Sequence, residues 1–167
     1  MNWLVPARNL FAGALICAVL ASSSATAVSL GQPLQFFLGR TEMISTVKVF
    51  ARRPYQSRTL GTGRILPDGS LALIQQVFEE GKSEKRRNWK IRQLAPGRYG
   101  GTMSDAVGPV VVEEVDGRYR FVFRMKGNLS VEQWLTPVAG GDAAKSNLTV
   151  RKFGFRVASS VGVVRRL

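Results

Sequence analysis

The sequence contains no histidine and only one cysteine, Cys17. Without histidine, the chain cannot build a Ser-His-Asp site, a haem histidine ligand or an ordinary structural zinc site. We expect Cys17 to be removed with an N-terminal leader, which would leave neither a thiol nucleophile nor a disulfide. These absences exclude most familiar hydrolase chemistry, and we expect a non-catalytic protein with no metal and no cofactor.

Acidic residues are also scarce: 11 Asp and Glu stand against 24 Lys and Arg, which gives a formal net charge of +13. Such a charge concentrates anions near a protein without any specific pocket. In an exported chain, the expected partners are anionic envelope lipids or polymers, whereas nucleic acid is the usual partner of a basic cytoplasmic chain and is not expected here. The alternative is a soluble surface that is merely highly charged.

No apolar run reaches the ~20 residues that a membrane-spanning helix needs. The apolar stretch at residues 10–21 follows Arg8 and precedes Ala25-Thr26-Ala27, which fits the small-residue rule for signal peptide cleavage. We therefore predict a signal peptide helix over residues 1–27 and a mature periplasmic domain over residues 28–167 with no transmembrane span. A retained membrane anchor is the alternative.

From residue 41 onward the dominant period is two, which is typical of strands with one buried and one solvated face. In "RYRFVFRMKG", residues 118–127, aromatic and methionine side chains alternate with Arg and Lys. A helix would scatter those aromatics around its circumference. The candidate strands are residues 41–51, 57–66, 70–80, 82–94, 98–104, 107–115, 118–126, 129–136, 146–156 and 160–166.

Six turn signals lie between candidate strands: Asp68-Gly69, Glu80-Gly81, Pro96-Gly97, Asp116-Gly117, Gly127-Asn128 and Gly140-Gly141. Glycine accepts positive φ, and Asp or Asn bonds its own backbone, so each pair permits a tight reversal. Residues 33–39 are expected to form an apolar turn, or a single helical turn, that plugs one end of the core. So many linked strands predict an all-β, antiparallel up-and-down β-barrel of about 8–10 strands, with a two-sheet sandwich as the alternative.

The C-terminal stretch "NLTVRKFGFRVASSVGVVRRL", residues 147–167, also alternates. Its apolar positions are Phe153, Phe155, Val157, Val161 and Val163, with polar or small residues between them. This pattern predicts that the last two strands close the barrel and turn these apolar side chains toward its interior.

A basic segment, "GKSEKRRNWKIRQL" at residues 81–94, contains Arg87 and Trp89 on the face expected to point inward. An inward arginine must find a carboxylate, a carbonyl or a ligand anion to offset its desolvation. Two interpretations stay open here. Arg87 and Trp89 form either an internal ion pair or cation–π contact that closes the barrel floor, or part of a ligand site.

Adjacent acidic residues occur at Glu79-Glu80 and Glu113-Glu114. Neighbours on a strand point to opposite faces, so we interpret them as solvated strand ends rather than a catalytic pair. An enzyme acting through carboxylates, or through Lys and Tyr, would need inward carboxylates around an open cleft.

Four stretches carry a resemblance to a known family: "RNWKI" at 87–91, "RYGGTMSDAVGP" at 98–109, "EQWLTP" at 132–137 and "NLTVRKFGFRV" at 147–157. They resemble a bacterial envelope family catalogued as domain of unknown function family 3833. The resemblance covers the chain from about residue 36 to its end, and it implies a lipocalin-like (calycin) barrel with no assigned catalytic role. The family's acidic pair before the tryptophan is Glu132-Gln133 here, so no role for paired carboxylates is carried over.

We therefore expect a monomeric barrel that binds a small amphipathic or anionic ligand, such as a lipid. Barrels of about eight strands have room for one small ligand or only for side chains. The alternative is a structural or interaction protein that docks on anionic envelope surfaces through its basic exterior. The candidate ligand-binding residues are Arg87 as the anion contact and Trp89, Tyr99, Trp134, Phe153 and Phe155 as apolar lining.

Overall fold

Ten strands and one short helix make up residues 33–167, which are the residues that the computed structural model describes. The predicted leader, residues 1–27, lies outside them. The elements are α1 (Pro33–Phe36), β1 (Gly39–Val49), β2 (Tyr55–Ile65), β3 (Leu71–Glu79), β4 (Lys85–Ala95), β5 (Arg98–Met103), β6 (Val110–Val115), β7 (Arg118–Met125), β8 (Leu129–Pro137), β9 (Ala143–Lys152) and β10 (Phe155–Arg166).

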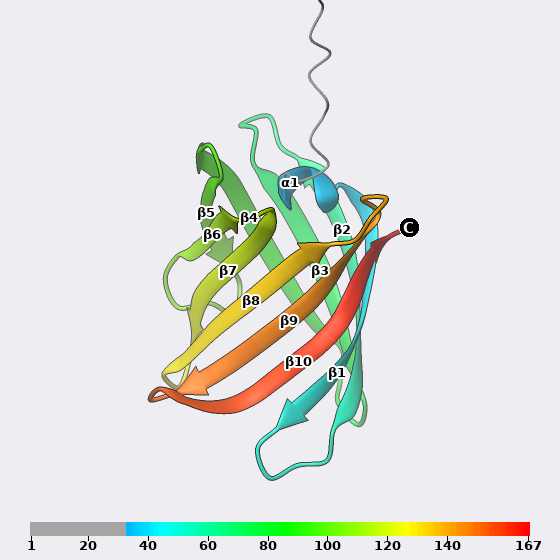
Figure 1. The fold of residues 1–167 in the computed structure, drawn as a ribbon, viewed down its shortest axis with the longest axis vertical. Coiled ribbons are helices and arrows are strands. Elements are labelled where there is room, and N and C mark those ends of the chain that lie inside the picture. Colours follow the sequence, from blue (N-terminus) through cyan, green and yellow to red (C-terminus); the bar gives the residue numbers. More distant parts are fainter. Residues whose placement is uncertain (1–32) are drawn as a thin grey trace, which may run out of the picture.

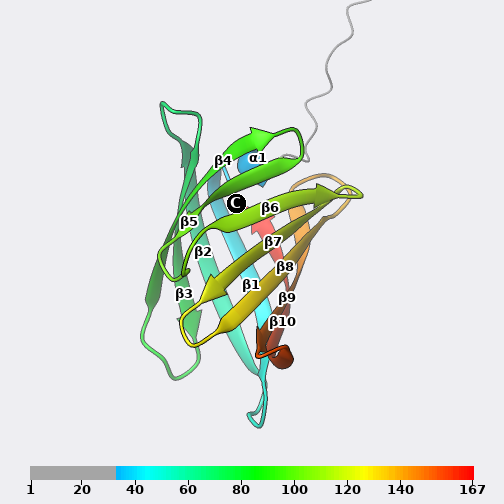
Figure 2. The same cartoon turned by 90° about the vertical axis from the view of Figure 1, so that its left-hand side faces the viewer.

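Each strand pairs antiparallel with the next one in the sequence, and β1 also pairs with β10. The register of this last pair runs from Thr41 opposite Arg166 to Val49 opposite Ala158. The pairing closes the sheet into an up-and-down barrel, which Figures 1 and 2 show from two sides. The predicted barrel is confirmed, and the two-sheet sandwich is excluded because the described sheet has no open edge.

The six predicted reversals all lie between strands, and each contains glycine with positive φ. Asp116 and Asn128 also adopt positive φ beside their glycines, at 51° and 58°. This backbone twist matches the twist of the flanking strands, which explains why these short turns are favoured.

The C-terminal hairpin differs from the prediction. Strand β9 ends at Lys152, Phe153 and Gly154 form the turn with φ of 50° and 86°, and β10 then continues unbroken to Arg166. The break expected at residues 157–159 is absent. Instead, the β9–β10 register shifts between Arg156 and Ala158, which leaves Val157 as the extra residue of a β-bulge.

The bulge also changes which face later residues occupy. Val161 is 61% exposed on the outer face, and Val163 pairs with the exposed Ile44. The prediction that Val161 and Val163 point inward is therefore wrong. Since the register of β10 restarts after the bulge, Ser160, Gly162 and Val164 take the inner positions.

The interior has two unlike walls. Large aromatic residues are buried on β4 to β7, whereas small hydroxyl residues are buried on β1, β2 and β9 across the barrel. The aromatic wall comprises Trp89, Tyr99, Tyr119, Phe121 and Phe123; the hydroxyl wall comprises Thr41, Ser45, Ser57, Thr59 and Ser146. A side chain between them therefore meets π-faces on one side and polar groups on the other.

Helix α1 covers one end of the barrel, called the upper end here (Figure 1). Leu34 is buried, and Phe36 and Phe37 pack against the core with their rings edge to face at 5.1 Å. The segment lies so close to β2 that a Cβ atom on Gly63 would be 1.9 Å from the carbonyl oxygen of Phe37. The predicted plug is thus confirmed, and its position requires a glycine at residue 63.

Both limits of the described chain lie at this upper end. Residue 33 begins α1, and the amide of Leu167 donates to the carbonyl of Arg40 at 2.9 Å. Figure 1 shows the C-terminus beside the start of β1. In the part of the chain from residue 33 onward, no helix has both the length and the apolar character needed to cross a bilayer.

Candidate functional site

A cavity of about 80 Å³ lies inside the barrel. In this measure one water needs roughly 10–15 Å³, so the space accommodates several waters or a small chemical group. Its wall is mostly apolar, with five polar side chains. The lining residues are Phe37, Thr41, Met43, Thr59, Leu73, Gln75, Arg87, Trp89, Ile91, Phe121, Phe123, Gln133, Leu135, Leu148 and Val164.

Arg87 is the one cationic side chain among these lining residues. Its Nε lies 2.9 Å from Oδ2 of Asp105, which follows β5, and Nζ of Lys85 lies 2.7 Å from the same oxygen. The Asp105 side chain is only 13% exposed. Burial raises the pKa of Asp105, but the hydrogen bonds from Lys85 and Arg87 outweigh it, so the pKa lies below its usual value. The carboxylate is therefore charged and held between two cations.

Arg87 keeps donors for a further acceptor. A guanidinium group has five N–H donors in a fixed planar arrangement. Among residues 33–167, the hydrogen bond described for Arg87 uses only Nε, with Asp105 as the acceptor. The terminal nitrogens can therefore meet an anionic group in the cavity without breaking the internal ion pair.

Two amide side chains add polar groups to the cavity wall. The indole N–H of Trp89 donates to Oε1 of Gln75 at 2.8 Å, and Nε2 of Gln133 donates to Oγ of Ser146 at 2.9 Å. Each bond holds the amide in one orientation. The Gln75 amide nitrogen and the Gln133 carbonyl oxygen are the groups that these two bonds leave for another partner.

Trp89 and Tyr99 both lie in the interior, as predicted. Trp89 is 9% exposed, and its ring meets Phe123 edge to face at 5.7 Å. Tyr99 is 1% exposed, but it packs in the core and does not line the cavity. Burial, with a smaller effect from the charge of Glu114, raises the pKa of Tyr99. Its phenol is thus neutral at ordinary pH.

Trp134 does not line the interior, so that prediction is wrong. The inward residues of β8 include Val131 and Leu135, which are both buried, and Trp134 falls on the opposite face. There the guanidinium of Arg118 lies 4.6 Å from the Trp134 ring centre, and the indole N–H donates to Glu132 at 2.9 Å. Trp134 is half-buried because these charged neighbours cover it from outside.

Phe153 and Phe155 are likewise misplaced by the sequence prediction. They are 71% and 78% exposed, at the turn between β9 and β10. Phe153 is part of the two-residue turn and lies beyond the paired residues. Phe155 is the first residue of β10 and pairs with Lys152 at the very end of the barrel, so strand parity does not bring either ring into the core. Of the six predicted residues, Arg87 and Trp89 meet at the cavity.

Sequence reasoning missed the polar lining contributed by Gln75 and Gln133. A signal was present, because each glutamine lies two residues from inward apolar residues on its strand. Gln75 follows Leu73, and Gln133 precedes Leu135, so alternation alone puts both amides inside.

On β1, β9 and β10, the lower end of the barrel is less covered than the upper end. At the upper ends of β1, β9 and β10, the inward residues Thr41, Ala144 and Val164 are buried. At the lower ends of the same strands, inward residues are only half-buried; these are Val47, Val150, Ala158 and Ser160. The lower end is thus less tightly packed on β1, β9 and β10, whereas inward residues at the lower ends of β2, β3 and β5 to β8 are buried.

Neither a metal cluster nor a catalytic carboxylate is found at the cavity. No acidic residue is among its lining residues, and residues 33–167 contain no group of three or more Cys, Asp or Glu placed to hold a metal ion. Within the described chain, the polar groups of the cavity are donors, amides and hydroxyls.

Comparisons with known proteins support the fold. No family model matches the chain, so the resemblance to the envelope family stays a prediction, and no curated protein matches it significantly. The structure is similar to an S-type phycobiliprotein lyase, CPES, from Guillardia theta, with a TM-score of 0.64 and 9% identity over 80% of this chain and 90% of that one.

A second similar structure is a DUF3598 family protein of unknown function from Nostoc punctiforme. Its TM-score is 0.58, with 13% identity over 81% of this chain. The match covers 49% of the Nostoc protein, so this chain spans about half of its length. Identities this low establish a shared lipocalin-like barrel and nothing further.

Proposed function

We propose that this protein is a non-catalytic binder that holds the anionic group of one small amphipathic molecule inside its barrel. The observation that carries the proposal is the placement of Arg87, with donors to spare, on the wall of an otherwise largely apolar cavity. An anion there gains charge-assisted hydrogen bonds, while apolar atoms of the same molecule contact Trp89 and Phe123.

The size of the cavity limits how such a molecule fits. A space of about 80 Å³ holds a carboxylate or a similar headgroup, but not a whole lipid. The rest of a longer ligand would extend toward the lower end, past the half-buried Met43 and Leu148. We propose this path because α1 covers the other end.

We also propose that the protein is exported to the periplasm and belongs to the envelope family that it resembles. The leader-like residues 1–27 support export, and the quoted sequence stretches support the family assignment. In that compartment, fatty acids and lipid fragments are amphipathic anions of the proposed class.

Octanoate and octanol test the proposed function, because they share an alkyl chain and differ in charge. We expect the wild-type protein to bind octanoate more tightly than octanol in isothermal titration calorimetry. Arg87→Gln should weaken octanoate binding by about tenfold and remove most of the preference for the acid. The matched control is Arg86→Gln, an exposed neighbour on the outer face, which should change neither affinity.

Native mass spectrometry of protein purified from its own host gives an independent test. A retained mass of a few hundred daltons that is lost in Arg87→Gln would support the proposal. Equal binding of octanoate by both Arg variants, or no binding of either probe by the wild type, would contradict it.

A further inference from the structure

Three phenylalanines project into solvent from the lower end of the barrel. Phe50, Phe153 and Phe155 are 81%, 71% and 78% exposed. Phe50 follows β1, and its amide donates to the carbonyl of Val157 on β10 at 2.9 Å, which joins its loop to the β9–β10 hairpin. The three rings therefore belong to two adjacent hairpins at one end of the barrel.

Basic residues surround these rings, and acidic residues are absent from the same segments. Residues 47–55, 123–131 and 149–157, which form three of the lower hairpins, contain no Asp or Glu. Their exposed basic residues are Lys48, Arg52, Arg53, Arg124, Lys126, Arg151, Lys152 and Arg156. Within residues 33–167, none of these eight takes part in a salt bridge. We call the eight basic residues and three phenylalanines the basic aromatic rim.

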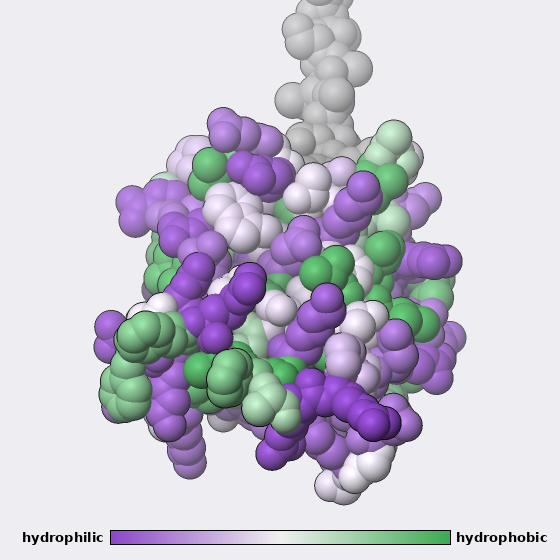
Figure 3. Space-filling view, turned by 60° about the horizontal axis from the view of Figure 1, so that its bottom comes forward, coloured by the Kyte–Doolittle hydropathy of each residue, from purple (hydrophilic) through white to green (hydrophobic). Residues whose placement is uncertain are grey.

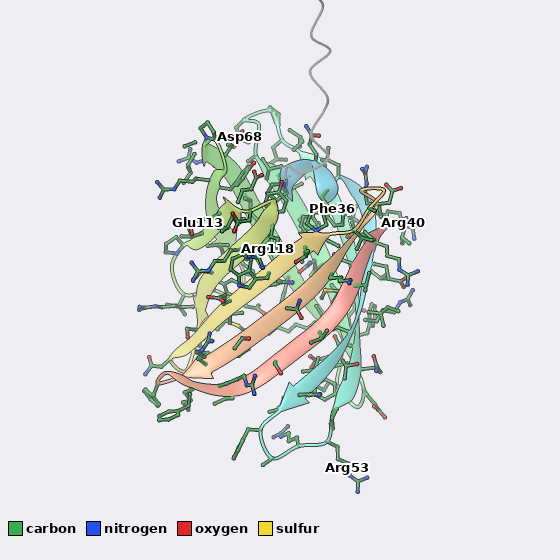
Figure 4. All side chains as sticks on the ribbon, viewed as in Figure 1. Phe36, Arg40, Arg53, Asp68, Glu113 and Arg118 are labelled. Atoms are coloured by element: carbon green, nitrogen blue, oxygen red, sulfur yellow. The ribbon has the colours of Figure 1, made fainter. Side chains whose placement is uncertain are left out.

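Figure 3, which brings this end forward, shows apolar side chains beside strongly hydrophilic ones on the same face. In Figure 4, Arg53 lies at the lower tip of the molecule, whereas Arg40 lies at the upper end. The rim therefore faces away from α1 and occupies three of the five hairpins at the lower end, β1–β2, β7–β8 and β9–β10.

Phe153 is the bulkiest of the four non-glycine residues with positive φ among residues 33–167. Its φ is 50°, a value that costs a bulky side chain energy and that Asn, Asp or Gly adopts more easily. The comparable turns of this barrel have Asp116-Gly117 and Gly127-Asn128. Packing does not explain the phenylalanine, because 71% of it is exposed.

We propose that the basic aromatic rim docks the barrel, lower end first, on a bilayer surface rich in anionic phospholipid. The phenylalanine rings enter the interfacial region, and the surrounding Lys and Arg side chains approach the lipid phosphates. This docking deepens the alternative of a protein that binds envelope surfaces, by assigning the contact to one end of the barrel. It is independent of what the cavity binds.

Single-stranded nucleic acid is a less suitable partner for the same residues. Proteins that bind it line a groove with aromatic rings, so that successive bases stack along a continuous path. Here the rings project from loop tips, and each is more than two thirds exposed. That arrangement suits insertion into an interface better than stacking in a groove.

Vesicle flotation tests the proposal with full-length protein. We expect binding to vesicles of phosphatidylcholine with 30% phosphatidylglycerol, weaker binding in 1 M salt, and little binding to pure phosphatidylcholine. The rim variant is Phe50→Ser, Phe153→Ser, Phe155→Ser, and its partition coefficient should fall by about tenfold or more. The control variant replaces three exposed apolar residues elsewhere: Ile74→Ser, Leu94→Ser, Val161→Ser.

Two matched double charge reversals test whether the basic residues of the rim contribute to vesicle binding. Arg52→Glu with Arg53→Glu should abolish most binding to phosphatidylglycerol vesicles. Arg40→Glu with Arg64→Glu makes the same change in net charge at the upper end and should preserve most of it. If both pairs reduce binding equally, the contact depends on overall charge and the proposal fails.

Phe153→Asn separates docking from folding. Asparagine adopts positive φ readily, so this variant should be at least as stable as the wild type in urea while binding vesicles several-fold more weakly. A Phe155→Trp reporter should show a blue-shifted emission that brominated lipid quenches. Unchanged binding by the rim variants, an unquenched reporter, or tight single-stranded DNA binding with no vesicle binding would overturn the proposal.

Discussion

Asp105 is the residue that makes an inward arginine tolerable in this barrel. The carboxylate accepts hydrogen bonds from both Arg87 and Lys85, and it is more buried than either cation. Removal of the carboxylate would leave the half-buried Arg87 without its described acidic partner. The loss of stability would be larger than if both members of the ion pair were replaced by apolar residues. The ion pair left open in the sequence therefore exists, and it coexists with a position on the cavity wall.

Asp105→Asn should lower the free energy of unfolding at pH 7 by about 1–3 kcal/mol. Because the folded-state pKa of Asp105 is depressed, this stabilisation is fully present above about pH 4 and is lost as the pH falls through the folded pKa. The difference between wild type and variant in urea unfolding should thus narrow below pH 4. The control is Asp142→Asn, at an exposed aspartate, which should lower the free energy of unfolding much less. If the stability difference between wild type and Asp105→Asn stayed constant with pH, Asp105 would not be the titrating group.

Individual residues also show that strand parity predicts the direction of a side chain better than residue type does. Arg87 and Trp89 were placed correctly because β4 is regular from Lys85 to Gln93, so parity holds along it. Trp134 was placed wrongly although Val131 and Leu135 define the inner face of β8. Trp134 is aromatic and was expected to line the interior, but the cationic side chain of Arg118 covers its ring outside the barrel. Parity was the better guide than residue type.

Among the elements, α1 depends most directly on one residue of another strand. Gly63 on β2 leaves room for the Phe37 carbonyl, and any side chain there must displace backbone. The plug was predictable from the apolar residues 33–39, but its contact with β2 was not, because a close approach of two backbones leaves no periodic pattern.

Gly63→Ala should displace the plug and destabilise the protein by about 1–3 kcal/mol in urea unfolding. The Leu38 amide, which donates to the Gln35 carbonyl at 3.2 Å, should also lose protection from hydrogen exchange. Gly100→Ala is the control, because the one close contact of the added methyl would be with Cδ1 at the end of the exposed Leu94 side chain, at 2.8 Å. Equal stability of the two variants would show that the plug does not depend on Gly63.

The C-terminal hairpin shows the opposite case, in which the elements were predicted but not their limits. Two strands were expected, and β9 and β10 are present. The turn could not be located because Phe153 is unusual at positive φ, and the break expected at residues 157–159 is absent from the structure. A bulge adds one residue without any marker in composition, and the inner face after it was therefore assigned incorrectly.

At the scale of the whole molecule, the closed antiparallel barrel followed from alternation and from glycine-containing turns. Both signals are local in the sequence. They were enough to predict the topology because, in a sheet built from short hairpins, each strand pairs with its neighbour in the sequence. Closure between β1 and β10 was inferred from the cost of open edges and from the alternation of the C-terminal stretch. The cavity itself depends on how side chains from eight strands meet, which no linear pattern specifies.

Export is the whole-molecule prediction that stands outside the described residues. Periplasmic protein should begin at Val28, because small residues at Ala25 and Ala27 precede the expected cleavage site. The intact mass of protein recovered by osmotic shock checks this. Protein that keeps residues 1–27 and remains in the membrane fraction would favour the retained anchor instead.

The start of α1 and Leu167 share the upper end, on the opposite side from Arg53 and the rest of the rim. A reporter domain fused after Leu167 would therefore point toward the aqueous compartment when the barrel rests on lipid. Crosslinkers placed on such a fusion would capture neighbours in solution, whereas crosslinkers on the β1–β2 loop would capture lipids. Comparison of the products captured from these two crosslinker positions would thus reveal the orientation of the docked protein.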